Sequence, residues 1–167
     1  PRVDNMLSIT NDGRKAALDM RLIDPSAIDH PDSKVNVCCS KVFDIWESSK
    51  GFRGTQLVFC DLSTPSTDGR FSVYNDLRSK WVAMGIPDQE IAFIHDFDSD
   101  AAKAKLFKAV REGKVRILLG STPKLGMGTN VQTKLIALHH LDCPWRPSDV
   151  EQRDGRIERQ GNTNAVI

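Results

Sequence analysis

The sequence lacks the patterns that identify most zinc-binding, membrane and secreted proteins. Its 4 cysteines form no C-x-x-C pair, and its 4 histidines show no zinc-ligand spacing with them. No apolar run approaches the roughly 20 residues of a membrane-spanning helix, and the start PRVDNMLSIT has no secretion-signal layout. A formal net charge of +1 gives no general attraction to a polyanion. We therefore expect buried thiols in a reducing compartment, no membrane partner, and at most a local site for polyanions.

The motifs of a complete nucleotide hydrolase are also missing. There is no G-x-x-x-x-G-K-[ST] phosphate loop, because the glycines of GSTPKLGMG are not followed by GK[ST]. No Asp-Glu motif follows a predicted strand to hold magnesium, and no Ser-His-Asp or Cys-His arrangement stands out. Of the adjacent histidines His139 and His140, we expect one to be packed and one to be at the surface. The missing initiator Met and the apolar end suggest a piece of a longer protein.

What is present is an alternation of helical and strand-like segments. We predict helices and strands in the following ranges: helices at 12–22, 34–50, 71–85, 101–113 and 148–160, and strands at 55–62, 90–97, 115–121, 133–142 and 164–167. Ser99 or Asp100 can cap the fourth of these helices, and Ser148 can cap the fifth. The alternation predicts one α/β domain with a mainly parallel sheet flanked by helices.

In such a sheet, ligands bind at the carboxyl ends of the strands. Three predicted loops fall at that edge: STPS at 63–66, the Gly-rich STPKLGMGTN at 121–130, and DCPWRP at 142–147. These loops are therefore the first places to look for a site.

The stretch EQRDGRIERQGN, residues 151–162, follows the last of these loops. On a helix, Gln152, Arg156 and Arg159 lie at i, i+4 and i+7 and share one face. Two guanidiniums on one face, beside an amide, make a fork-shaped receptor for an anion.

An ordinary solvated helix explains the same stretch in another way. Asp149 and Arg153 have the favourable acid-first order of an i, i+4 ion pair. Gly155 inside a helix costs up to ~1 kcal/mol relative to Ala, which suggests close packing against it. Spacing alone leaves both interpretations open.

Taken in order, these motifs resemble the second RecA-like lobe of superfamily-two helicases, and the Swi/Snf-type branch above all. That lobe carries an apolar strand, a GxGxN loop, a D-x-x-W-x-P turn and a Q-x-x-x-R-x-x-R helix. The matching residues here are Gly126, Gly128 and Asn130 in the loop, Asp142, Trp145 and Pro147 in the turn, and Gln152, Arg156 and Arg159 in the helix.

The resemblance covers about residues 34–167, and residues 1–33 form a leader helix and linker. The sequence departs from the branch at Arg146 and Asn162, where Asn and Gln are usual, and by the extra Pro144. The leader DGRKAALDMRLIDP is similar to phage and plasmid proteins that join such a helicase to an adenine methyltransferase.

The resemblance implies a RecA-like three-layer domain that closes over ATP bound to a first lobe. It implies that Arg159 is an arginine finger with Arg156 beside it, and that Gln152 orders this helix and the nucleotide. It places Asn130 near the ribose, and Gly128 where the backbone approaches closely. ATP and Mg²⁺ are then held mainly by the first lobe of the full-length protein, and we expect the isolated chain to be inactive.

The resemblance also implies contacts to a DNA backbone from Thr122, and from Ser63 and Thr64. Lys124 is a further phosphate partner by location alone. Contacts of this kind position a strand without reading its sequence, although Thr122-Pro123 and Ser63-Thr64-Pro65 are also ordinary turn sequences.

The expected function is half of an ATP-dependent DNA helicase or translocase in the cytoplasm of a bacterial host. Its partners would be DNA and the N-terminal RecA-like lobe of the same parent chain. The alternative is a non-catalytic RecA-like module that binds DNA or protein.

Overall fold

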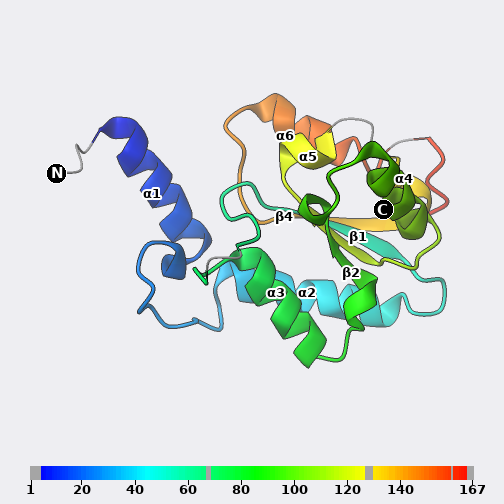
Figure 1. Cartoon of the computed structure of the whole chain (residues 1–167), viewed down its shortest axis with the longest axis horizontal. Coiled ribbons are helices and arrows are strands. Elements are labelled where there is room, and N and C mark those ends of the chain that lie inside the picture. The colour runs from blue at the N-terminus through cyan, green and yellow to red at the C-terminus, as the bar shows by residue number, and fades with distance from the viewer. Residues whose placement is uncertain (1–4, 67–68, 127–129, 159, 165–167) are drawn as a thin grey trace.

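A four-stranded parallel sheet lies between two layers of helices in the computed structural model, which describes residues 5–66, 69–126, 130–158 and 160–164 (Figure 1). The strands are β1 (Thr55–Phe59), β2 (Ile91–Phe93), β3 (Ile117–Gly120) and β4 (Leu135–His140), in the order β2-β3-β1-β4. The α-helices are α1 (Met6–Leu18), α2 (Lys34–Ser48), α3 (Val73–Ala83), α4 (Asp100–Arg111), α5 (Thr122–Gly126) and α6 (Pro147–Asp154). The predicted α/β class is confirmed.

Both faces of the sheet are buried at β1, β2 and β3, as these apolar strands require, whereas the edge strand β4 is mostly only partly buried. On β1, Val58 packs with the apolar side chains of α2 and α3, whereas Leu57 and Phe59 pack with those of α4. This period of two assigns alternate residues of each strand to opposite faces. Figure 1 shows α2 and α3 on one side of the sheet, with α4, α5 and α6 on the other.

Helix α2 shows how the local sequence produces this layer. Ser33 caps it by accepting a hydrogen bond from the Asn36 backbone N–H at 3.2 Å. The buried residues recur at helical spacing: Val35, Cys38, Cys39, Val42 and Trp46. The indole of Trp46 donates to Glu90 Oε2 at 2.7 Å, so the polar edge of this large side chain is satisfied within the core.

The cysteines only partly follow the expectation of buried thiols. Cys38, Cys39 and Cys60 are buried, but Cys143 is exposed. Burial raises the pKa of the Cys38 thiol to about 12 and that of Cys39 to about 11. These thiols stay protonated and behave as small apolar side chains.

Several predicted boundaries are wrong because 3₁₀ turns replace the strand ends. The 3₁₀ turns are η1 (Met20–Leu22), η2 (Asp88–Glu90), η3 (Ile94–Asp96) and η4 (Gln132–Lys134). The turns η2 and η3 flank β2 and shorten the strand predicted at 90–97, and η4 shortens the one predicted at 133–142. The loop predicted at 121–130 contains the short helix α5.

The helix ends also differ from prediction. The leader helix starts at Met6 and stops at Leu18, because Asp19 is extended and its carboxylate caps η1 through the Arg21 N–H. Ser99 caps α4 as predicted. Ser148 does not cap α6, since Pro147 occupies the first turn and Arg146 is the N-cap residue. The strand predicted at 164–167 lies, apart from Asn164, outside the described residues.

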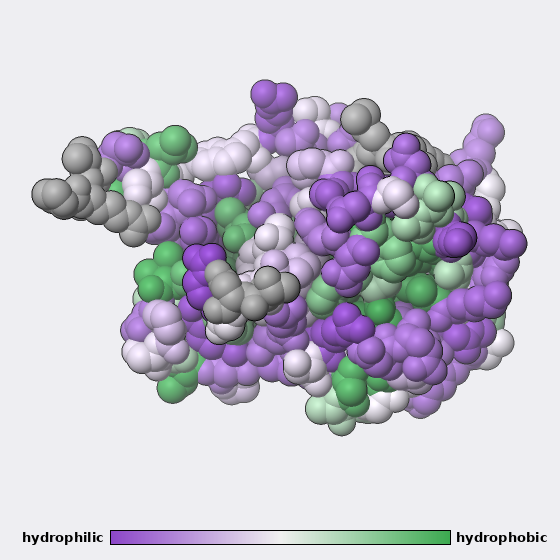
Figure 2. All heavy atoms as spheres, in the orientation of Figure 1, coloured by the Kyte–Doolittle hydropathy of each residue, from purple (hydrophilic) through white to green (hydrophobic). Residues whose placement is uncertain are grey.

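The leader helix α1 projects from the body of the molecule (Figure 1). Only Leu18 of this helix is buried, and Met6, Leu7 and Ile9 are exposed. Hydrophilic residues cover most of the face shown in Figure 2, with separate hydrophobic patches between them. In the described part of the chain, no helix combines the length and apolarity of a bilayer span.

The histidine pair on β4 divides as predicted, with His139 partly buried and His140 exposed. His139 Nε2 lies 2.9 Å from the Gln56 side-chain oxygen. Burial, together with the nearby charges of His140 and Lys41, lowers the pKa of His139 to about 4. The folded state therefore holds His139 neutral at pH values where an unfolded chain, with a histidine pKa of about 6.5, is already protonated.

We predict that the protein loses stability as the pH falls from about 6.5 towards about 4, where the unfolded state binds more protons than the folded state. Urea unfolding should show a loss on the order of 1–3 kcal/mol across this window. The variant His139→Gln should lose less, because it removes the titrating group. The matched variant His30→Gln, at an exposed position, should keep the wild-type pH dependence. Equal slopes for wild type and His139→Gln would contradict the assignment.

Candidate functional site

The carboxyl ends of β1, β3 and β4 form one edge of the sheet because these strands are parallel neighbours. The pairing aligns Phe59 with both Gly120 and His140, the last residues of β3 and β4. A polar residue stands at the same offset beyond each strand end: Asp61 after β1, Thr122 after β3 and Asp142 after β4. The register therefore brings these residues together.

Arg153 on α6 joins these residues into one network. Its Nη2 donates to Asp61 Oδ2 at 2.9 Å and to Asp142 Oδ1 at 3.1 Å. Its Nη1 donates to the Asp142 carbonyl at 2.9 Å, and its Nε donates to Thr122 Oγ1 at 2.8 Å. The residue is 1% exposed, so these charge-assisted bonds act away from bulk water, where they are strong.

The carboxylates also accept hydrogen bonds from the residues that follow the strand ends. Asp61 accepts from the Thr122 N–H at 2.6 Å and from the Thr122 hydroxyl at 2.8 Å. Asp142 Oδ2 accepts from the backbone N–H groups of Asp61 and, at 2.8 Å, Leu62. The network thus orders both the loop after β1 and the start of α5.

Aromatic and glycine residues allow the network to pack tightly against the sheet. The Arg153 guanidinium lies over the Phe59 ring, 5.1 Å from its centroid. The His140 ring stacks on the same residue, and His140 Nε2 lies 2.9 Å from Asp154 Oδ1. A Cβ at Gly120 would collide with the side chain of Leu125, so this glycine lets α5 approach the end of β3.

The arginine-rich helix predicted at 148–160 is shorter in the structure. Helix α6 ends at Asp154 with Gly155 as its C-cap residue, and Arg156 lies in the following turn. The prediction that Gln152 and Arg156 share one helical face is therefore wrong. The close packing expected at Gly155 is also absent, because the nearest atom to a Cβ there is the Glu151 carbonyl of the same helix.

Arg153 also departs from the solvated-helix interpretation. Instead of pairing with Asp149 on the surface, it turns inward to Asp61 and Asp142. Arg156 is 3% exposed. Arg159 lies outside the described residues.

The residues predicted to contact DNA gather around this edge. Ser63 is buried and its hydroxyl accepts from the Val73 N–H at 2.9 Å, whereas Thr64 is exposed. The Thr122 hydroxyl donates to Asp61 and accepts from Arg153, so it is fully engaged within the lobe. The Lys124 ammonium is partly exposed and 3.9 Å from Asp98 Oδ1.

Two of the three residues predicted to contact nucleotide, Asn130 and Gln152, lie among the described residues. Asn130 and Gln152 are exposed, and the Asn130 carbonyl accepts from Arg111 Nη1 at 2.6 Å. Gly128 lies outside the described residues. No group of three or more His, Cys, Asp or Glu among the described residues could hold a metal ion, and the carboxylates of Asp61 and Asp142 are already bound by Arg153.

Sequence reasoning missed Arg153 and Asp61 as members of the site. A usable signal was present, because Asp61 and Asp142 follow their predicted strands closely and parallel strands place such residues side by side. Paired carboxylates at that edge require a cation. The spacing around Arg153 pointed to a surface ion pair instead, so the identity of the cation became visible only in the fold.

The chain is similar to a known helicase domain family and to a phage protein. Residues 34–161 match the family model described as "Helicase conserved C-terminal domain". The chain is also similar to the "Defense against restriction protein B" of Escherichia phage P1, with 27% identity over 107 residues. That stretch is 64% of this chain and 4% of the phage protein, so the chain spans a small part of this relative's length.

We predict that Arg153→Met lowers the free energy of unfolding by about 3–5 kcal/mol, because it leaves two carboxylates without their buried cation. Arg153→Lys should lose less, since it keeps the charge but not the fork of donors. Chemical denaturation measures both effects. The control Arg146→Met removes an exposed arginine next to the same helix and should change stability by no more than about 0.5 kcal/mol. Similar losses for Arg153→Met and the control would rule out a central role for Arg153.

Proposed function

The chain belongs to the helicase conserved C-terminal domain family, and we propose that it is the second motor lobe of an ATP-dependent DNA helicase or translocase. In this role it supplies arginines to ATP bound on another lobe and backbone contacts to DNA. It does not itself hold the phosphates of ATP in a phosphate loop.

The observation that carries the proposal is the Arg153 network at the carboxyl edge of the sheet. A motor must couple nucleotide to nucleic acid, so its two binding regions need a mechanical connection. Arg153 bonds directly to Thr122, within the predicted loop 121–130, and to Asp61, two residues before the predicted loop 63–66. Both loops are predicted to contact DNA. Arg153 stands on α6, three residues before Arg156, in the segment predicted to reach the nucleotide. One guanidinium therefore links both regions.

DNA contacts are assigned to the groups around this network. The network itself is buried and has two carboxylates for one guanidinium, so a phosphate has no favourable approach to it. The exposed side chains of Thr64 and Lys124 lie outside it, and we assign phosphate contacts to them. Thr122 and Ser63 then contribute through the backbone that their hydroxyls hold in place, and such contacts are independent of base sequence.

The nucleotide contacts are assigned to α6, the turn that follows it and the segment after α5. Arg159 takes the role of arginine finger, and the buried Arg156 supports it from within the lobe. Gln152 and Asn130 are exposed and available to the nucleotide and its ribose, and Gly128 allows close approach of the backbone. A preorganised guanidinium stabilises the charge that develops on the transferred phosphoryl group. ATP and Mg²⁺ would be held mainly by the partner lobe.

The finer classification is part of the same proposal. The motif set supports the Swi/Snf-type branch and assigns the lobe to residues 34–167, following a leader at 1–33. Similarity to a phage protein named for defence against restriction supports a phage or plasmid origin, where a fused methyltransferase would act on the same DNA. In this setting, the protein would act in the cytoplasm of a bacterial host.

We predict that Arg159→Ala in the full-length protein that carries this lobe lowers the kcat of DNA-stimulated ATP hydrolysis by about 10³-fold or more. The physical reason is the loss of the guanidinium that offsets phosphoryl charge in the transition state. Steady-state ATPase assays with saturating DNA measure the effect, and circular dichroism checks that the fold is intact.

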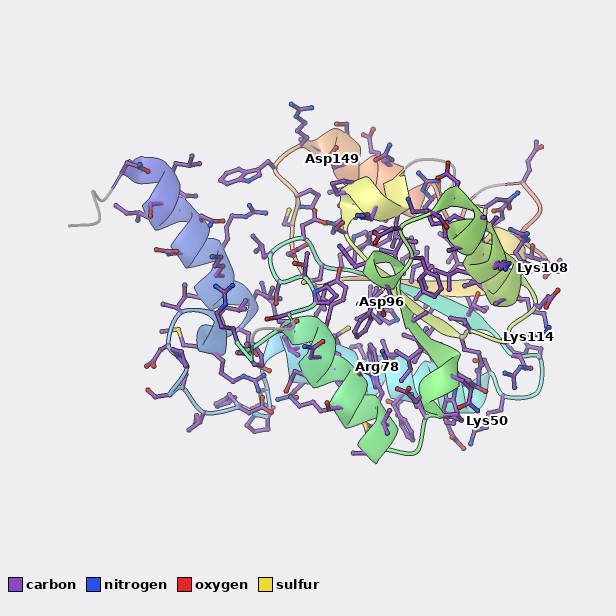
Figure 3. All side chains as sticks on the ribbon, viewed as in Figure 1. Lys50, Arg78, Asp96, Lys108, Lys114 and Asp149 are labelled. Atoms are coloured by element: carbon purple, nitrogen blue, oxygen red, sulfur yellow. The ribbon has the colours of Figure 1, made fainter. Side chains whose placement is uncertain are left out.

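The matched control is Lys108→Ala, an exposed cation on α4 at the end of the molecule away from α1 (Figure 3). It should leave kcat unchanged. Near-normal turnover by Arg159→Ala would overturn the finger assignment. A wild-type protein that binds DNA but hydrolyses no ATP would favour the non-catalytic module instead.

A further inference from the structure

The leader is fastened to the body of the protein at two separate places. Arg21, in the turn η1, donates to both carboxylate oxygens of Asp76 on α3, at 3.2 and 3.1 Å. Earlier in the chain, Arg14 Nη2 donates to the Cys143 carbonyl at 2.6 Å, in the turn that precedes α6. Because α3 and α6 lie on opposite sides of the sheet (Figure 1), the leader joins the two helix layers.

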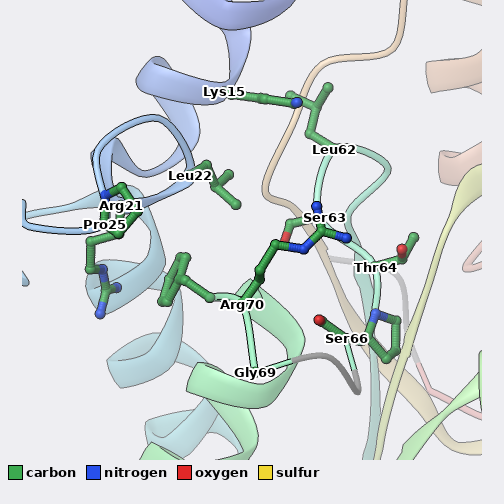
Figure 4. Close-up of a pocket in the computed structure, with 12 residues that line it drawn as sticks. Lys15, Arg21, Leu22, Pro25, Leu62, Ser63, Thr64, Ser66, Gly69 and Arg70 are labelled. Carbon is green, nitrogen blue, oxygen red and sulfur yellow. The ribbon is translucent and has the colours of Figure 1, made fainter.

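Between these two places the leader lies beside a cavity of about 630 Å³ (Figure 4). Lys15 and Leu22 line this cavity from the leader, and Leu62 and Ser63 line it from the loop after β1. Apolar burial contributes little to the position of α1, since Leu18 is its one buried residue. The position of the leader therefore depends largely on the two arginine contacts.

The contact at Arg21 belongs to a cluster of charged side chains. Arg21 also donates to the two carboxylate oxygens of Asp19, at 2.9 and 2.7 Å. The Lys80 ammonium of α3 lies 2.7 Å from Asp76 and 2.6 Å from Asp29. Charge-assisted bonds from the leader and α3 share these carboxylates, so this end of the leader is held firmly against α3.

The contact at Arg14 is made to the turn at 142–147. Besides its hydrogen bond to Cys143, the Arg14 guanidinium lies 4.4 Å from the centroid of the Trp145 ring. An aromatic face attracts the cation in a direction different from that of the hydrogen bond. Arg14 therefore restrains both the backbone of the turn and one of its side chains.

The Arg153 network binds the same turn from α6. Arg153 Nη1 donates to the Asp142 carbonyl at 2.9 Å, and Arg14 binds the next carbonyl along the chain, that of Cys143. Two guanidiniums from different elements thus hold adjacent peptide groups. Pro144 follows directly and has a fixed φ, which leaves this part of the turn little freedom to absorb a displacement.

Asp142 makes the turn important for the site. Its carboxylate accepts from Arg153 Nη2 at 3.1 Å and from the Leu62 N–H at 2.8 Å. Without Arg14, the contacts of the network alone would place Asp142. The leader therefore acts on the network through the residue next to Asp142.

We infer that Arg14 is a positioning residue that acts through the turn at 142–147. It restrains Asp142 from the leader, and Asp142 in turn restrains the Arg153 guanidinium and, with it, α6. The leader, which the family match at 34–161 does not include, thereby becomes a working part of the lobe. Its effect on ATP turnover rests on the proposed motor function.

Hydrogen–deuterium exchange of the complete chain, followed by NMR, tests the inference without ATP or DNA. The Leu62 N–H is a direct reporter, because it bonds to the Asp142 carboxylate. In Arg14→Ala this amide should exchange several-fold faster than in wild type, while the amides of α2 keep their wild-type rates. Arg14→Lys keeps a donor for the carbonyl and a cation for the ring, so it should restore most of the protection.

The matched control is Lys15→Ala, which removes the same charge from the next residue of α1, where the side chain lines the cavity. It should exchange like wild type. The inference is overturned if Arg14→Ala leaves the Leu62 amide at the wild-type rate, or if Arg14→Lys or Lys15→Ala exchanges as fast as Arg14→Ala. Equal acceleration of the Leu62 and α2 amides in Arg14→Ala would also overturn it, because this result indicates a general loss of stability.

ATP hydrolysis by the full-length protein measures the consequence for the motor. Arg14→Ala should lower kcat on the order of 10-fold and leave the KM for ATP unchanged, because a displaced α6 alters the geometry of the transition state more than binding to the partner lobe. Arg14→Lys should recover most of the loss, and Lys15→Ala should match wild type. A wild-type kcat for Arg14→Ala, beside faster exchange at Leu62, would show that turnover does not depend on the leader.

The outcomes can be told apart from those of the motor proposal. If the wild-type protein hydrolyses no ATP, or if Arg159→Ala is fully active, the motor or the finger assignment fails, and exchange at Leu62 still decides the role of Arg14. If Arg159→Ala is inactive while Arg14→Ala matches wild type in both exchange and kcat, the leader inference fails and the motor proposal stands.

Discussion

The site depends on one buried cation. Arg153 is enclosed by Asp61, Asp142 and Thr122, which arrive from the ends of three different strands. A charge removed from water is tolerated only when its donors are matched by acceptors, and here a guanidinium meets two carboxylates, a hydroxyl and a carbonyl. The arrangement is specific as well as stabilising, because the fork of donors accepts only one relative placement of these groups. The loops at this edge are therefore held in register with α6.

In the proposed function, this constraint connects the two ligand-binding regions of the lobe. The loops after β1 and β3 face the proposed DNA path, and the turn after α6 faces the proposed nucleotide. Because Arg153 of α6 bonds to Thr122, a displacement of α6 either moves Thr122 or breaks this hydrogen bond. A change at the proposed nucleotide region is thereby transmitted to the proposed DNA region. The leader helix adds only Leu18 to the core, and Arg14 and Arg21 hold it through directional contacts. Directional contacts of this kind fix the orientation of the leader helix, which a small hydrophobic contact would not restrain.

Much of the fold was predictable because its signals are local. The spacing of Val35, Cys38, Val42 and Trp46 predicts α2, and the strand segments follow from short apolar runs. Predictions failed where a neighbouring element decided the outcome. The helix predicted at 148–160 is too long, since α6 ends at Asp154, before Gly155. The predicted strands are also too long, because residue propensity does not distinguish a 3₁₀ turn from the end of a strand. The Arg153–Asp149 pairing was wrong because a buried carboxylate pair competes better for a guanidinium than a surface acid does.

The sequence by itself determined the layers of the fold and the position of the polar loops at one edge. The hydrophobic period and the alternation of strands with helices depend on residues close together in the chain. It also carried the ordered motifs that resemble a helicase lobe. Tertiary structure alone decided which arginine is enclosed and which carboxylates enclose it. Those relations join residues far apart in the chain. Charges pair according to distance in space, and that distance is set only when the parallel strands have aligned their ends.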